Sequence, residues 1–235
     1  MSFNIYGLLV GIAAVVALLL IEKKGKSVGF EFKHYIFDLL TIFSFSIFSA
    51  RLWHVITDFG LYQDDLFSTL YFWNGGMSIL GAILGCFIAV LLLSKIENYE
   101  FLKLLDLIVF GLPFAQSIGR WGNYFNQELY GWETNLPWGI MINGVKHHPL
   151  FLYESLLTFT FGIYIWFFCK KERIGKGKIF LVYLSFYSFV RFLLDFLRIE
   201  KTMINEWLGI NQLVLVFIFL VSLSFLLKRE EKIEG

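Results

Sequence analysis

Long runs of apolar residues dominate this sequence of 235 residues. A helix needs about 20 mostly apolar residues to cross the roughly 30 Å hydrocarbon core of a bilayer. We therefore predict an all-α membrane protein, a single integral membrane domain over 1–235, with about seven transmembrane helices. The expected spans are 3–21, 36–57, 77–95, 101–119, 149–169, 178–198 and 207–227. The first span has no basic segment before it, so we interpret it as a retained span and not as a cleaved signal peptide.

The distribution of lysine and arginine predicts the orientation of these spans. Both residue types are enriched in cytoplasmic loops. With the N-terminus outside, fourteen of them fall on the inner side and four on the outer side, and Arg51 and Arg191 lie within spans. We therefore expect an outer N-terminus and a cytoplasmic C-terminus. The outer arm segments are 58–76 and 120–148, and the second of them is expected to form an arm or lid on the outer face between spans four and five.

Charge and motif content exclude several other classes of protein. The formal net charge of +1 argues against nucleic acid as a partner, because phosphate-binding surfaces concentrate unopposed basic residues. Cys86 and Cys169 stand alone in or beside apolar segments, so we expect neither a disulfide nor a metal site. No nucleotide or flavin motif is present, and we expect no cofactor. A seven-span receptor or transporter is disfavoured because the sequence shows no repeated, broken helices.

Ionisable and polar side chains within or beside the apolar spans indicate a candidate site. A charged side chain at the centre of a bilayer costs about 2.5 kcal/mol or more, so each one needs a reason to be there. In the predicted orientation they gather at the outer ends of four spans. These residues are Arg51, His54, Arg120, Asn123, Tyr153, Glu154, Arg191 and Asp195. Guanidinium groups match phosphate oxygens well, so the pattern predicts an outward-facing phosphate pocket.

One helical stripe of the sixth span carries four of the polar side chains. Tyr187, Arg191 and Asp195 follow each other at intervals of four residues, and Arg198 lies seven residues after Arg191. An internal pair between Arg191 and Asp195 that only pins helix packing is an alternative interpretation. Convergence with Arg120 from another span favours a binding pocket.

The run from Gly119 to Gly131 reads Gly-Arg-Trp-Gly-Asn-Tyr-Phe-Asn-Gln-Glu-Leu-Tyr-Gly. It closely resembles the signature of prolipoprotein diacylglyceryl transferases, Gly-Arg-x-Gly-Asn-Phe-hydrophobic-Asn-x-Glu-x-x-Gly, and only Tyr124 departs from it. Other pieces occur in the order of the family, from Tyr6-Gly7 to Tyr187 and Arg191, so the resemblance covers nearly the whole chain.

This resemblance implies an activity and its partners. The family moves a diacylglyceryl group from phosphatidylglycerol to the lipobox cysteine thiol of a prolipoprotein, which is the first step of bacterial lipoprotein maturation. The expected partners are phosphatidylglycerol, a prolipoprotein signal peptide with its lipobox cysteine, and membrane lipid. The expected location is the bacterial inner membrane, with the active site toward the outer face.

Roles for individual residues follow from the resemblance and from the polar pattern. We assign Arg120 and Arg191 to the phosphate, and Glu128 and Asp195 to orienting the arginines. The candidate catalytic residues are Arg120, Arg191, Glu128, Asn123 and Tyr6. The candidate substrate-binding residues are Arg120, Asn126, Gly131, Asp195, Tyr187, Arg51, His54 and His148. The alternatives are that Asn123 and Asn126 cap a helix and that Gly131 is a turn glycine.

One departure from the family leaves the base that activates the thiol open. Leu80 stands where the family has a histidine proposed to be catalytic. A free thiol has a pKa of about 8.5, so its ionisation needs a base or nearby positive charge. His54, His148 or the arginines alone are the candidates. The alternative function is a non-catalytic or altered-specificity paralogue that binds phospholipid or prolipoprotein.

Overall fold

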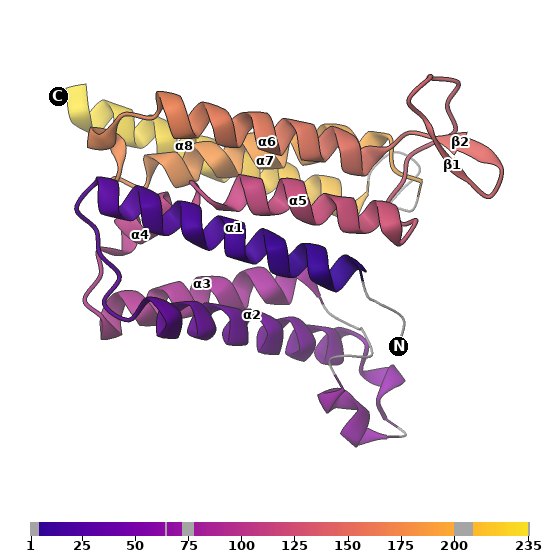
Figure 1. Ribbon diagram of the computed structural model, residues 1–235, viewed down its shortest axis with the longest axis horizontal. Helices are drawn as coiled ribbons and strands as arrows, with labels where there is room; N and C mark the ends of the chain where they lie inside the picture. The colour runs from indigo at the N-terminus through magenta and orange to yellow at the C-terminus, as the bar shows by residue number, and fades with distance from the viewer. Residues whose placement is uncertain (1–4, 64, 72–77, 200–208, 235) are drawn as a thin grey trace. The chain divides into compact units, whose positions relative to one another are not determined.

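The computed structural model describes residues 5–63, 65–71, 78–199 and 209–234, and these are mostly helical, as predicted (Figure 1). The α-helices are α1 Ile5–Ser27, α2 Tyr35–Thr57, α3 Ile79–Ile96, α4 Phe101–Ile108, α5 Leu112–Phe125, α6 Leu150–Phe168, α7 Lys178–Phe196 and α8 Ile210–Glu234. Short 3-10 helices are η1 Phe59–Leu61, η2 Leu66–Leu70 and η4 Lys171–Arg173, and the strands are β1 Ile140–Ile142 and β2 Val145–His147.

Several of these helices are suited to cross a membrane. Within the described ranges, α1, α2, α6, α7 and most of α8 are long and apolar enough, which gives five spans, or six if α4 and α5 form one bent span. The apolar part of α3 that the structure describes, Gly81–Ile96, is shorter than a full span. The chain is therefore a multi-pass membrane protein, and the count of seven stays a prediction.

The fourth predicted span is bent, and it ends later than predicted. The axes of α4 and α5 meet at 44°. Pro113 near the start of α5 cannot donate a backbone hydrogen bond, and its ring would clash with the carbonyl of Val109 in a continuous helix. After the break α5 runs to Phe125, beyond the predicted end at 119, so Arg120 and Asn123 lie in its last two turns.

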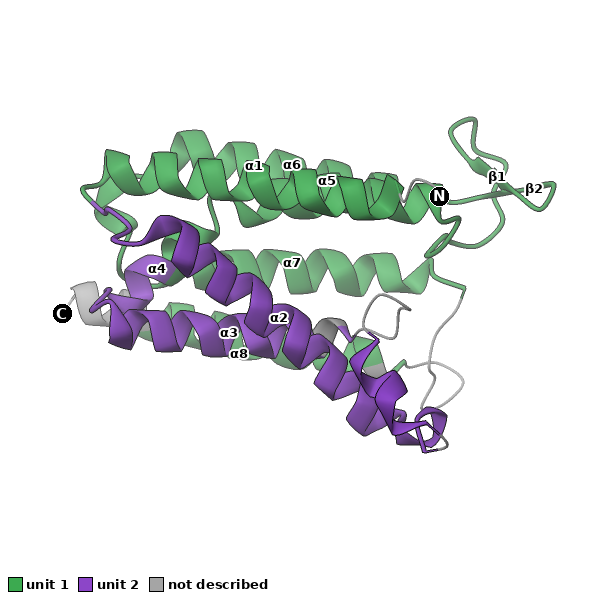
Figure 2. Ribbon diagram, turned by 60° about the horizontal axis from the view of Figure 1, so that its bottom comes forward, with its two compact units in different colours: residues 1–29, 105–235 green, residues 30–104 purple. Residues whose placement is uncertain are grey.

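The chain folds as two compact units, residues 1–29 with 105–235 and residues 30–104 (Figure 2). In the first unit α5 packs against both α1 and α6, and α7 packs against α8 and α6. In the second unit α2 packs along α3. Gly81 and Gly85 of α3 permit this close approach, because a Cβ on either would overlap the backbone of α2. The single domain over 1–235 stays a prediction.

The segment between α5 and α6 carries a small antiparallel hairpin. Strand β1 pairs with β2 so that Ile140 faces His147 and Ile142 faces Val145. Asn143 and Gly144 form the turn with φ of 50° and 85°, which is the left-handed backbone that two-residue hairpin turns require. The Asn-Gly pair thus explains the hairpin. The assignment of 58–76 and 120–148 to an outer arm stays a prediction.

Candidate active site

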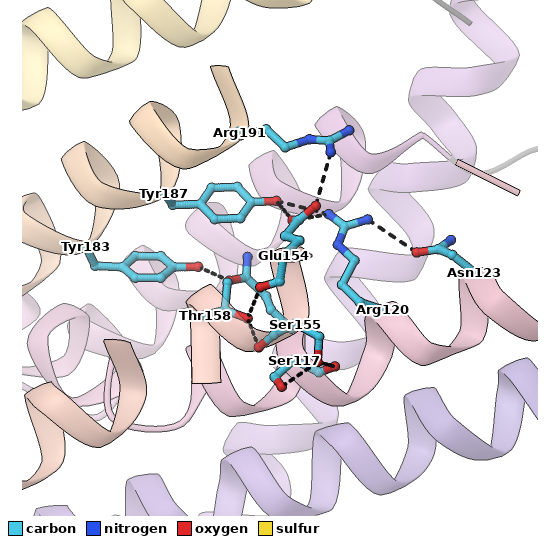
Figure 3. A network of polar contacts seen from close by, with 10 residues as sticks. Ser117, Arg120, Asn123, Glu154, Ser155, Thr158, Tyr183, Tyr187 and Arg191 are labelled. Carbon is cyan, nitrogen blue, oxygen red and sulfur yellow. Dashed lines mark hydrogen bonds and ion pairs between the residues drawn. The ribbon is translucent and has the colours of Figure 1, made fainter. Parts of the chain in front are cut away.

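The carboxylate of Glu154 lies at the centre of a polar cluster in the first unit (Figure 3). Glu154 is in the second turn of α6 and only 1% exposed. Nη2 of Arg120 lies 2.6 Å from Oε1 of Glu154, and Nη1 of Arg191 lies 3.1 Å from Oε2. Two guanidinium groups, one from α5 and one from α7, therefore meet on one buried carboxylate.

Tyrosines of α7 complete the inner side of this cluster. The hydroxyl of Tyr187 donates to Oε1 of Glu154 at 2.9 Å and accepts from Nη2 of Arg120 at 3.1 Å. The ring of Tyr183 stacks on that of Tyr187 with centroids 6.0 Å apart, and its hydroxyl donates to Oε1 of Gln116 at 2.6 Å. These bonds fix the positions of Arg120 and Glu154 from the side of α7.

Asparagines at the end of α5 connect Arg120 to Glu128. Nη1 of Arg120 donates to Oδ1 of Asn123 at 3.4 Å, and Nδ2 of Asn123 donates to Oε1 of Glu128 at 2.9 Å. Asn126, the C-cap residue that follows α5, also donates to Oε1 of Glu128, at 3.3 Å. Glu128 therefore orients the asparagines, and among the described residues its link to Arg120 runs through Asn123.

The backbone around Glu128 is strained. Gln127 and Leu129 on either side of it have φ of 53° and 56°. Non-glycine residues in this region cost about 1–3 kcal/mol each and concentrate at functional sites. The hydrogen bonds from Asn123 and Asn126 hold the Glu128 carboxylate against the end of α5 despite this strain, which supports a functional role for this turn.

The cluster keeps hydrogen-bond donors in excess. Arg120 and Arg191 carry two positive charges, and the buried carboxylate of Glu154 balances one of them. The side chains of the two arginines are 22% and 16% exposed, whereas that of Glu154 is 2% exposed. Arg191 uses one N–H group on Glu154 out of the five that a guanidinium offers. The arrangement can accept one further anion with paired N–H donors.

Tyr6 lies on the same end of α5. The ring of Tyr6 packs directly on Gly122, because a Cβ at this position would overlap the ring. Nearby, the hydroxyls of Ser117 and Ser155 lie 2.9 Å apart, and Ser155 also donates to the carbonyl of Ser117. Small residues thus let α1, α5 and α6 approach closely beside the arginine cluster.

Gly131 lies where three segments meet, and it is not a turn glycine with left-handed backbone. Its N–H donates to the carbonyl of His148 at 2.9 Å, and an added Cβ would lie 2.9 Å from that of His148 and 2.7 Å from the carbonyl oxygen of Leu197. Nδ1 of His148 contacts the hydroxyl of Tyr153 at 3.1 Å. Gly131 and His148 therefore shape the segment around the cluster.

Asp195 differs from its expected role. Its carboxylate is buried, and Oδ2 has no hydrogen-bond partner among the residues that the structure describes. In the described ranges neither arginine pairs with Asp195 or Glu128. The orienting role that we predicted for these two carboxylates belongs to Glu154.

Two further candidates belong to the second unit. Arg51 donates from Nε to the carbonyl of Thr69 at 2.8 Å and from Nη2 to that of Ser68 at 2.6 Å, so it holds the segment of η2 in place. Nδ1 of His54 lies 3.0 Å from Oδ2 of Asp58, one turn later. Leu80, which stands where the family has its histidine, lies in the first turn of α3. The segment 72–77 before this helix is outside the described residues.

Glu154 is the site residue that sequence reasoning underrated, although a signal was present. It is the one charged residue between 150 and 168, in an otherwise apolar helix. A buried carboxylate needs a cation, and the predicted pocket already held two arginines. Gln116 and Tyr183 carry no comparable signal, because a tyrosine and a glutamine in a span are common.

Fold and site together define a multi-pass membrane protein in which two arginines meet on one buried carboxylate. The profile of the prolipoprotein diacylglyceryl transferase family matches residues 1–228. A phosphatidylglycerol–prolipoprotein diacylglyceryl transferase of Clostridioides difficile is 35% identical over 200 residues, covering 85% of this chain and 80% of the relative. The corresponding proteins of Finegoldia magna and Listeria innocua are each 33% identical, over 97% and 98% of this chain and 92% and 87% of the relatives. The chain belongs to the prolipoprotein diacylglyceryl transferase family, which confirms the resemblance seen in the sequence.

Proposed function

We propose that this chain transfers the diacylglyceryl group of phosphatidylglycerol to the lipobox cysteine thiol of prolipoproteins, the first step of bacterial lipoprotein maturation. The observation that carries the proposal is the meeting of Arg120 and Arg191 on buried Glu154, with N–H donors left for a phosphate. The names of the relatives supply the substrates, and the arginine centre supplies a place for the headgroup.

The reaction replaces a carbon–oxygen bond by a carbon–sulfur bond. The thiolate sulfur attacks the glyceryl carbon that bears the phosphate, and glycerol phosphate leaves with the electron pair of the broken bond. Negative charge therefore grows on the leaving phosphate oxygen. Arg120 and Arg191 stabilise this charge, and Glu154 holds both guanidinium groups in position before the substrate arrives.

Neighbouring polar side chains position the rest of the headgroup. Asn123 and Asn126, both held by Glu128, present amide groups at the end of α5. Tyr6 lies on Gly122 at the same end. These side chains offer donors and acceptors to the glycerol hydroxyls of the lipid, which distinguishes this headgroup from a bare phosphate.

The positive charge of the two arginines also favours the thiolate form of the lipobox cysteine. His54 and His148 remain the candidate bases, since Leu80 cannot accept a proton. If a missing histidine weakens the site, replacing Leu80 by histidine should raise the initial rate of transfer at neutral pH. An unchanged rate would show that the arginine field suffices without a base at this position.

We further propose seven spans with the N-terminus outside, in the bacterial inner membrane, with the arginine centre toward the outer face. Arg120, Glu154 and Arg191 belong to the ends of α5, α6 and α7 that this orientation puts outside. Exposed aromatic side chains at that end suit the membrane interface. They are Trp121, Tyr124, Trp132 and Trp138.

A transfer assay tests the proposal. The purified protein is placed in vesicles that contain phosphatidylglycerol and is mixed with a lipobox peptide. We expect a mass gain of one diacylglyceryl group on the peptide, lost in Arg120→Ala and Arg191→Ala and kept in Lys146→Ala, an exposed control. Binding of phosphatidylglycerol without any mass gain would instead support the non-catalytic paralogue, the alternative favoured by Leu80.

A further inference from the structure

A second group of cations lies in the first unit, at the end of its helices opposite Glu154. Helices α1 and α6 end there and α7 begins there (Figure 1). Glu154 and Trp166 are separated by twelve residues of α6, or about 18 Å along the helix axis. The segments 22–29, 105–111 and 169–178 carry eight basic residues and three acidic ones. This end is therefore strongly electropositive.

Lys24 is the unusual member of this group. Only 9% of the residue is exposed, and its ammonium lies 4.3 Å from the ring centroid of Phe110 and 5.5 Å from that of Trp166. The carbonyl of Lys24 accepts a hydrogen bond from the hydroxyl of Ser27, but its ammonium forms no ion pair or hydrogen bond with another residue in the described ranges. Aromatic faces attract a cation, but they leave its charge unbalanced. A buried cation of this kind calls for an anion.

Two exposed cations of η4 lie beside Lys24. Nζ of Lys171 donates to the carbonyl of Ser27 at 2.9 Å, which ties η4 to the end of α1. Burial raises the pKa of the Cys169 thiol, and the positive charges of Lys24 and Arg173 oppose that rise. Both cations therefore act on the charge of Cys169, and the bond of Lys171 to Ser27 brings the basic η4 segment to the end of α1 that carries Lys24.

The acidic residues of this end do not balance these cations. Both oxygens of Asp106 accept backbone N–H groups, from Gly175 and Gly177 at 2.9 and 2.8 Å and from Phe180 at 3.0 Å. Glu22 pairs with Lys26. Glu172 is exposed and forms no ion pair with a described residue. The charges of Lys24, Lys171 and Arg173 remain available to a ligand.

We propose that Lys24, Lys171 and Arg173 bind the phosphate of an anionic glycerophospholipid at this end of the unit. Charge complementarity selects an anion, and the last turn of α6 offers apolar side chains to acyl chains, since Phe167 and Phe168 are 74% and 71% exposed. The site lies beyond the proposed function, because it is separated from the arginine centre. In the proposed orientation its lipid belongs to the cytoplasmic leaflet, where anionic headgroups attract basic segments.

Lipid retention measured by native mass spectrometry tests this site. The full chain carries Arg120→Ala, which removes the proposed headgroup site, and is titrated with phosphatidylserine, an anionic lipid that is not the proposed substrate. We expect one phosphatidylserine to be retained, and phosphatidylcholine not to be. Lys24→Met should weaken retention about fivefold, and the double variant Lys171→Gln with Arg173→Gln about 25-fold, since each basic side chain near an anionic headgroup contributes about 1 kcal/mol.

Matched controls decide between a site and general charge. Lys24→Arg keeps the charge and should retain the lipid, and Lys228→Gln removes a charge from exposed α8 and should leave binding unchanged. The proposal would be overturned if Lys228→Gln weakened lipid retention as much as the Lys24 and η4 variants do, or if those variants retained the lipid like the unchanged protein. Displacement of the lipid by inorganic phosphate as readily as by phosphatidylserine would also overturn it. If Lys24→Met does not fold, lipid retention by the double variant Lys171→Gln with Arg173→Gln tests the site, because both of these side chains are exposed. Failure of the transfer assay leaves this result untouched, because Arg120 is already absent.

Discussion

At the scale of single residues, the shared carboxylate of Glu154 explains why two arginines can lie together inside an apolar helix bundle. Without an anion between them the two guanidinium groups would repel each other. The buried carboxylate of Glu154 accepts from one N–H group of each. The same bridge sets the distance between the two arginines. Their spacing, and therefore the fit of a phosphate, depends on the charge of Glu154.

Replacing Glu154 by glutamine should therefore lower both activity and stability. The amide keeps the size of the side chain but leaves two partly buried guanidinium groups without their anion, and breaking a buried pair destabilises by about 3–5 kcal/mol. Misplaced arginines should lower the transfer rate about 100-fold. Initial rates and thermal unfolding in detergent measure the two effects, with exposed Glu172→Gln as the matched control. A Glu154→Gln enzyme with the rate of the unchanged protein would show that the bridge does not position the arginines.

Two glycines of the signature give a second comparison on one helix. An added Cβ at Gly122 would overlap the ring of Tyr6, whereas at Gly119 it would meet no neighbour within 4 Å. Gly122→Ala should displace Tyr6 and lower the transfer rate about tenfold or more, because overpacking costs about 1–3 kcal/mol. Gly119→Ala should keep the rate and stabilise α5 slightly. Equal rates for both variants in the peptide assay would refute a positioning role for Gly122.

At the scale of elements, a buried carboxylate from α4 fixes the start of α7. Asp106 of α4 accepts three backbone N–H groups from the segment that begins α7, and it is fully buried. It thereby supplies from a distant helix the acceptors that a helix N-terminus lacks. Arg191 lies near the other end of α7, so we expect its position along the helix axis to depend on this anchor.

Asp106→Asn should loosen this anchor. An amide group replaces one oxygen, and hydrogen bonds to a charged group contribute about 1.5–3 kcal/mol each, so we expect a lower midpoint of thermal unfolding. Scanning calorimetry or cysteine-reactive dye unfolding in detergent measures it. Glu172 is an exposed carboxylate in the connection between α6 and α7, so Glu172→Gln should leave the midpoint of thermal unfolding unchanged. The idea is wrong if both variants unfold together with the unchanged protein.

The elements also show which part of the fold the sequence could predict. Apolar runs located α2, α6 and α7 within two residues at each end, because span length is a local property. Helix α1 runs to Ser27, six residues beyond the predicted end of the first span, because its last turns are polar. The end of α5 was placed too early, since Arg120 and Asn123 look like loop residues in isolation. Their partners, Glu154, Tyr187 and Glu128, lie on other segments, and only folding brings them together. Pro113 marks the break before α5 but not its angle.

At the scale of the whole molecule, the sequence predicted that two arginines from separate spans would meet, because charged groups at one membrane depth need each other. It could not predict which carboxylate they share. Asp195 lies one turn from Arg191 and was the nearer choice along the chain, yet Glu154 of another helix makes the contact. Which helices pack together follows from long-range contacts that hydropathy does not contain, and so does the division into two units.

The proposed orientation makes a prediction for the whole chain in intact cells. Basic residues concentrate at the end of the first unit where α7 begins, just after Lys176, and the arginine centre lies at the opposite end of α7, on the side of strand β2, which contains Lys146 (Figure 1). In a variant with Cys86 and Cys169 replaced by alanine, Lys146→Cys should react with a membrane-impermeant maleimide added outside. Lys176→Cys should react only after the membrane is opened, because the positive-inside rule places it in the cytoplasm. Both side chains are exposed, so burial does not limit either reaction. The reverse labelling pattern would place the arginine centre on the cytoplasmic face, away from the outer surface where the proposed acceptor thiol arrives.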